Sequence, residues 1–102
     1  MKPTTPYYAV IFTSKRTEGD SGYNKMATQM MHLAQQQKGF IGVESAREKI
    51  GITVSYWESL VAIQNWKANT AHLVAQEKGK TNWYASYHVR ICKVEREYQF
   101  EL

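Results

Sequence analysis

Cysteine, proline and glycine are scarce in this chain of 102 residues, which has one cysteine, two prolines and six glycines. A single cysteine cannot form an internal disulfide, and the few glycines form no loop of the kind that holds phosphate groups. The sequence also lacks an apolar run long enough to cross a membrane, and its start lacks the apolar stretch of a signal peptide. We therefore expect a cytoplasmic protein with a short tail at residues 1–6 and a single domain at residues 7–102.

The charge pattern argues against a nucleic-acid partner, although the net charge is +4. Basic residues alternate with acidic ones, as in "KVEREYQFEL", so a mixed solvated surface is expected in place of a basic stripe. The segment "KIGITVSY" lacks the glycine and the stacking rings of an RNA-recognition strand. The three histidines, His32, His72 and His88, fall on separate expected elements, so we expect no metal site.

The first half of the sequence predicts a strand, a helix and a hairpin. Tyr7 to Lys15 is rich in β-branched and aromatic residues, which indicates a strand. Apolar residues at helical spacing predict a helix over Ser21–Lys38, capped by Asp20 or Ser21 and ended by Gly39. The runs "GFIGVESAR" and "GITVSYW", separated by "EKIG", are typical of a β-hairpin.

The second half predicts helices and a final strand. Ser59 is expected to cap a helix, which "KANT" loosens or breaks, and Thr70 is expected to cap a second, shorter helix. The segment "NWYASY" is interpreted as one more helical turn, and the alternation over Tyr87–Phe100 predicts a long strand.

This order of elements predicts an α+β protein with a ferredoxin-like βαββαβ fold, in which helices cover one face of an antiparallel sheet. The other face would then be left bare, although apolar residues point to both faces. Seven tyrosines, three tryptophans and three phenylalanines are also more rings than a small core easily hides. A homodimer with the sheets stacked on each other would cover the bare face.

Several ordered segments resemble the antibiotic biosynthesis monooxygenase (ABM) domain family: "GFIGVESAR", "GITVSYWES", "AIQNWK", "AH" and "RICKVEREYQF". The resemblance spans about Tyr7 to Phe100. It implies a dimeric α/β barrel with a pocket between helices and sheet in each protomer. The family contains cofactor-free oxygenases of polycyclic aromatic phenols, haem-degrading enzymes, quinol oxygenases and members of unknown activity.

The haem-degrading branch of this family uses an Asn on the first strand, a Trp on the second helix and a His ten positions after that Trp. Trp66 matches the Trp, but Gln76 stands at the His position, with His72 one turn earlier. Phe12 or Thr13 stands where the Asn is needed. The resemblance therefore implies a cofactor-independent monooxygenase that uses O₂ on a small aromatic, phenolic or quinol-type compound. The alternative is a non-catalytic or haem- or small-molecule-binding member of the family.

Three residues are candidates for catalysis. His72 is the candidate base because its ordinary pKa is close to neutrality, and the alternative is that it packs at a helix start. Trp66 follows Ile63 by three positions and is a pocket wall or a core residue. Tyr84 is the candidate phenolic donor, or else a core ring.

Five further residues are candidates for substrate binding. Arg47 would clamp a phenolate or carboxylate, unless it pairs with Glu44, and Gln76 would orient the substrate. Trp83 and Tyr87, four positions apart, would share a helical face and roof the cleft, unless they are core residues. Phe12 would line the pocket from the first strand.

Overall fold

A computed structural model describes residues 5–18, 22–76 and 83–102, and for residues 71–76 it describes the backbone alone. The elements in chain order are β1 (Tyr7–Arg16), α1 (Tyr23–Gln35), β2 (Phe40–Arg47), β3 (Gly51–Trp57), α2 (Leu60–Gln76) and β4 (Tyr84–Val94). This order confirms the predicted ferredoxin-like βαββαβ fold.

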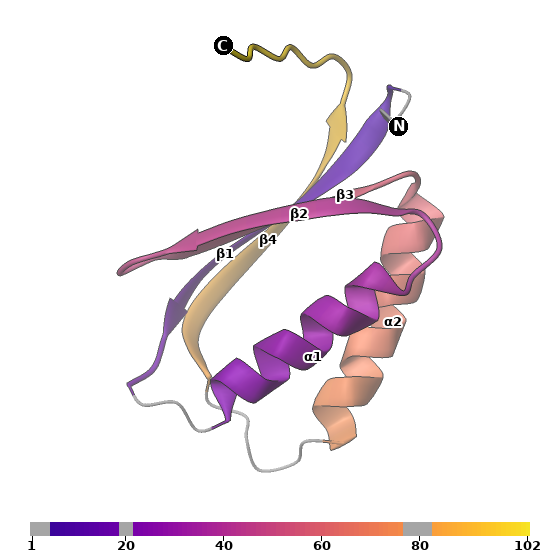
Figure 1. Ribbon diagram of the computed structural model, residues 1–102. Helices are drawn as coiled ribbons and strands as arrows, with labels where there is room; N and C mark the ends of the chain where they lie inside the picture. Colours follow the sequence, from indigo (N-terminus) through magenta and orange to yellow (C-terminus); the bar gives the residue numbers. More distant parts are fainter. Residues whose placement is uncertain (1–4, 19–21, 77–82) are drawn as a thin grey trace.

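The four strands form one sheet in the order β2-β3-β1-β4, and each neighbouring pair is antiparallel. Both helices lie on the same side of this sheet (Figure 1). Because side chains alternate along a strand, Val10 and Phe12 of β1 face the helices, whereas Ala9 and Ile11 face away.

The core lies between the helices and the end of the sheet where β1 begins and β3 ends. Its buried members are Val10, Ala34, Trp57, Ala62 and Ile63. Trp57 has no exposed surface, and its indole Nε1–H donates to Ser55 Oγ at 2.9 Å. The largest ring of the core therefore has its one polar atom paired, as a buried indole requires.

Helix α1 is shorter than predicted at both ends. Its N-cap is Gly22, with a φ of 86° and no capping side chain, so the prediction of Asp20 or Ser21 as cap is wrong. Those two residues lie outside the described part of the chain. The helix ends at Gln35, and the chain turns into β2 through Gly39, whose φ is 90°.

Helix α2 is continuous, so the predicted break at "KANT" and the cap at Thr70 are wrong. The predicted cap at Ser59 is confirmed, because its Oγ accepts from the Ala62 backbone N–H at 3.1 Å. The polar side chains of the "KANT" segment bond to the helix itself: Asn69 Nδ2 donates to the Asn65 carbonyl and Thr70 Oγ1 donates to the Lys67 carbonyl. Such bonds satisfy these side chains without interrupting the helix.

Strand β4 begins three residues before the predicted strand and ends six residues before its predicted end. The predicted helical turn at "NWYASY" is wrong, because Tyr84 pairs with Arg16 and the Thr17 backbone N–H donates to the Trp83 carbonyl. After Val94 the chain runs without helix or strand and projects from the sheet (Figure 1). On this segment of residues 95–102, the C-terminal segment, Tyr98, Phe100 and Leu102 are almost fully exposed.

The second face of the sheet carries apolar side chains that no helix of the described chain covers. Ile52 is 46% exposed, and Cys92, which pairs with Ala9 and points to the same side, is exposed. We call this side the open face. No helix among the described residues has both the length and the apolar character needed to cross a bilayer.

Candidate functional site

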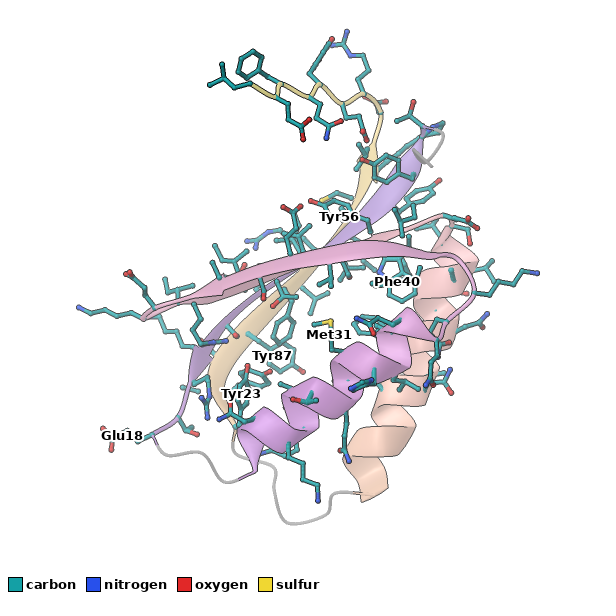
Figure 2. All side chains as sticks on the ribbon, in the orientation of Figure 1. Glu18, Tyr23, Met31, Phe40, Tyr56 and Tyr87 are labelled. Carbon is teal, nitrogen blue, oxygen red and sulfur yellow. The ribbon has the colours of Figure 1, made fainter. Side chains whose placement is uncertain are left out.

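Four aromatic side chains meet where β1 ends, β4 begins and α1 starts. Phe12 lies 5.3 Å from Tyr84 and 5.4 Å from Tyr87, measured between ring centroids, and the Phe12 and Tyr87 rings are stacked. Tyr23 of α1 meets Tyr84 edge to face at 5.7 Å. Figure 2 shows Tyr23 and Tyr87 close together between α1 and the sheet. We call Phe12, Tyr23, Tyr84 and Tyr87 the ring cluster.

A β-bulge brings Tyr84 and Tyr87 to the same side of β4. Tyr87 pairs with Ser14, and the register shifts between Lys15 and Arg16, so that Tyr84 pairs with Arg16. Ser14 and Arg16 lie on the helix-facing side of β1, since Phe12 does. Two residues three positions apart would otherwise point to opposite faces of a strand, and the extra residue of the bulge removes that difference.

Two guanidinium groups border the ring cluster. Arg16 Cζ lies 3.6 Å from the centroid of the Tyr23 ring, and Arg47 Cζ lies 5.9 Å from it. Arg47 Nη2 also donates to the buried Ser14 hydroxyl at 2.6 Å. The cluster thus combines flat apolar surface with positive charge, which suits an aromatic ligand that carries negative charge.

The Tyr84 phenol is held in its protonated form. Its pKa is raised well above the ordinary value of 10, first because the side chain is removed from water and second because of hydrogen bonding with Tyr23. The charges of Arg47 and Arg16 act in the opposite direction but do not cancel the rise. At neutral pH Tyr84 is therefore a hydrogen-bond donor rather than a base.

The structure brings four of the predicted site residues together. Phe12, Tyr84 and Tyr87 belong to the ring cluster, and Arg47 borders it. Arg47 contacts Ser14 and Tyr23, in place of the alternative ion pair with Glu44, whose carboxylate accepts from the Tyr56 hydroxyl.

Of the two predicted tryptophans, Trp66 lies in the core, apart from these four residues, whereas Trp83 directly precedes Tyr84. Trp66 packs on Trp57 in the core, with ring centroids 5.1 Å apart, and its buried Nε1–H has no acceptor among the described residues. Trp57 pairs with Tyr8, which lies about 13 Å along β1 from Phe12. Trp83 is buried and precedes β4, so the helical spacing used to group it with Tyr87 does not apply.

His72 and Gln76 lie on the last turns of α2, and their side chains fall outside what the structure describes. Their predicted roles as base and orienting group therefore stay predictions. Sequence reasoning missed Tyr23, Arg16 and Ser14. For Ser14 and Arg16 the available signal was the alternation of side chains along β1. Phe12, Ser14 and Arg16 occupy alternate positions of this strand, so their side chains share one face of the sheet.

Comparison with known proteins places the chain among relatives of unestablished activity. No family model matches it. The uncharacterized protein YqjZ of Bacillus subtilis (strain 168) is 52% identical over 101 residues, which cover 97% of this chain and 89% of YqjZ.

Solved structures with little sequence identity share the fold. SnoaB, a cofactor-independent oxygenase from Streptomyces nogalater, superposes with a TM-score of 0.74 at 8% identity, covering 91% of this chain and 97% of SnoaB. A putative antibiotic biosynthesis monooxygenase from Nitrosomonas europaea gives a TM-score of 0.70 at 10% identity, over 90% and 93% of the two chains. The ferredoxin-like fold of the single chain is thereby confirmed, and by its sequence the chain belongs to the same family as YqjZ.

Proposed function

We propose that the protein is a cofactor-independent monooxygenase of a small aromatic compound of the phenol or quinol type. The observation that carries this proposal is the ring cluster, bordered by two guanidinium groups, on the helix-covered side of the sheet. Aromatic walls bind a flat ligand, and the cations favour its deprotonated form. The shared fold with SnoaB, a cofactor-independent oxygenase, also supports it.

Oxygenation without a metal or flavin requires a substrate that itself gives electrons to O₂. A base removes a proton from a phenol or an activated CH₂ group, and the anion transfers one electron to O₂. The substrate radical and superoxide then form a C–O bond, and loss of water converts CH₂ to C=O. One oxygen atom ends in the product and the other in water, and the substrate supplies all the electrons.

Three groups have roles in this scheme. Tyr84 donates a hydrogen bond to the substrate oxyanion, because its phenol stays protonated. Arg47 lies beside Tyr23 and stabilises the negative charge. His72 is the base that the sequence suggests, carried on α2, the helix that also holds Trp66.

The test is oxygen uptake with anthrone and hydroquinone. We expect His72→Ala to lower kcat by about a hundredfold or more, as loss of a general base does, and Tyr84→Phe to lower it by about a hundredfold through loss of an oxyanion donor. Tyr98→Phe is the matched control, because Tyr98 is 86% exposed on the C-terminal segment.

Equal rates in wild type and His72→Ala would remove His72 from the mechanism. Absence of uptake by the wild type would reject the monooxygenase. The alternative, a binding protein without turnover, predicts a raised melting temperature with an aromatic ligand but no oxygen consumption.

We also propose that the protein is a homodimer whose open faces meet. The open face presents apolar side chains, among them Ile52, Ile11 and Val54. The C-terminal segment alternates exposed apolar residues with Glu97, Gln99 and Glu101, a pattern typical of a strand that lacks a partner. A second copy of the chain would cover both the open face and the C-terminal segment. In a twofold dimer the same surfaces of the two copies contact each other.

A further inference from the structure

We infer that the ring cluster binds an aromatic ligand bearing a carboxylate, and that Arg47 holds this group. The inference rests on the site of the proposed function and specifies its substrate class. It concerns binding alone, so it is tested without turnover.

The first observation is that two cations share one ring. The Arg16 and Arg47 guanidinium groups lie 3.6 and 5.9 Å from the centroid of Tyr23. Positive charge beside an aromatic ring favours an aromatic ligand that carries negative charge. In the part of the chain that the structure describes, Arg47 contacts the Ser14 hydroxyl and the Tyr23 ring, and neither carries a negative charge.

The second observation is that the Arg47 side chain is held in place. Its Nη2 donates to the Ser14 hydroxyl, and Ser14 is only 2% exposed. The guanidinium also lies across Gly51, where an added Cβ would come within 2.1 Å of Nη2 and 2.2 Å of Cζ. A buried hydroxyl and a residue without a side chain therefore set the position of the guanidinium of Arg47, a residue exposed to solvent. Such a group loses little conformational freedom when a ligand binds.

Three chemical features of the site indicate which ligand it would bind. A guanidinium presents a planar fork of donors that matches the two oxygens of a carboxylate. Next to it, the stacked rings of Phe12 and Tyr87 offer a flat apolar surface, and the Tyr84 phenol offers a donor. A hydroxylated aromatic acid matches all three features, and the net charge of +4 favours its approach.

The experiment compares two ligands that differ by one carboxylate, 2-naphthol and 3-hydroxy-2-naphthoate. Binding is measured by calorimetry without oxygen and at low salt, so that no reaction and little screening interfere. We expect the carboxylate to bind the wild type about tenfold tighter or more, the size of one charge-assisted contact. Acetate is the control for the carboxylate without the ring, and we expect no measurable binding.

Two variants separate the charge of Arg47 from its position. Arg47→Gln should abolish the preference for the carboxylate, because it should weaken the binding of 3-hydroxy-2-naphthoate far more than that of 2-naphthol. Gly51→Ala keeps the charge but displaces the guanidinium, and it should reduce the preference. The matched controls are Gly42→Ala, whose added Cβ meets nothing within 4 Å, and Lys67→Gln, which removes one positive charge from the exposed side of α2. Circular dichroism and melting temperature confirm that each variant is folded.

Equal affinity of the two ligands for the wild type, no binding by either, or an unchanged preference in Arg47→Gln would overturn the inference. Unchanged preference in Gly51→Ala alone would show that the position of Arg47 is not fixed by Gly51. Because these measurements exclude oxygen, a carboxylate preference without any oxygen uptake would retain this inference and reject the monooxygenase. Oxygen uptake with neutral substrates, without a preference for the carboxylate in binding, would retain the monooxygenase and reject this inference.

Discussion

Tyr84 shows how strongly the properties of one residue depend on its neighbours in the fold. Three groups set its pKa besides burial: Tyr23 raises it by hydrogen bonding and by charge, and Arg47 and Arg16 lower it. None of these groups lies within 30 positions of Tyr84 in the sequence. The sequence indicated Tyr84 as a phenolic donor from its residue type. Its environment depends on the pairing of β1 with β4, which no local pattern reveals.

Titration of the tyrosines by ultraviolet absorbance tests the pKa of Tyr84. At about pH 11, exposed tyrosines are mostly ionised, whereas Tyr84 in the folded protein should stay protonated. Tyr84→Phe should therefore leave the ionised signal of the folded protein unchanged, although it lowers the signal in denaturant by one tyrosine.

The same shift makes stability depend on pH. The pKa of Tyr84 is higher in the folded than in the unfolded protein, so above about pH 10 the unfolded state loses a proton that the folded state keeps. The free energy of unfolding should then fall as pH rises, and fall less steeply in Tyr84→Phe. A reduced folded-state signal in Tyr84→Phe at about pH 11 would show that Tyr84 ionises like an exposed tyrosine.

At the scale of elements, the sequence predicted the kind and order of strands and helices but placed several ends wrongly. Strands β1 and β3 matched closely, because β-branched residues and turn residues mark both of them. The predicted break in α2 was wrong because Asn69 and Thr70 bond to the helix that holds them. The start of β4 was missed because its first residues are defined by pairing with Arg16. Local composition therefore indicates an element, whereas long-range pairing sets its ends.

The turn that leads from α1 into β2 allows a test of what fixes the start of β2. Gly39 has a φ of 90°, and a Cβ there would lie 2.7 Å from the Cβ of Ala62 on α2. We expect Gly39→Ala to lower the free energy of unfolding by about 2 kcal/mol or more, from backbone strain together with this clash. The measurement is urea denaturation followed by circular dichroism.

The control for this turn is Gly42→Ala, because a Cβ added to this glycine of β2 would meet no atom within 4 Å. It should change the free energy of unfolding by no more than about 0.5 kcal/mol. Equal effects of the two substitutions would show that the conformation of Gly39 is not required.

At the scale of the whole molecule, the main feature is that one face of the sheet and the C-terminal segment remain uncovered in a single chain. Phe100 is 83% exposed and Tyr98 is 86% exposed. The sequence indicated a surplus of rings and a bare sheet face, and the structure identifies where these rings lie. The proposed homodimer and the cytoplasmic location both stay predictions.

Sedimentation velocity at micromolar concentration tests the homodimer. We expect a species of about twice the chain mass of 11.8 kDa. Phe100→Ser and Tyr98→Ser should weaken association, whereas Val61→Ser, which also removes an exposed apolar group but from α2, should not.

The chain's only cysteine gives a second measure of the same state. Cys92 is exposed on the open face of a single chain, so its reaction with a thiol reagent should slow as protein concentration rises. A monomer at micromolar concentration, with Cys92 reacting at a constant rate, would reject the homodimer.

The bulge beside Arg16 has a consequence for how β4 tolerates change. Tyr84 and Tyr87, on either side of the bulge, supply the ring cluster, and alternate residues farther along β4, such as Arg90 and Cys92, supply the open face. One strand thus serves two surfaces whose side chains point in opposite directions. Substitutions that retune ligand choice and substitutions that retune self-association can accumulate in the same eleven residues with little interference.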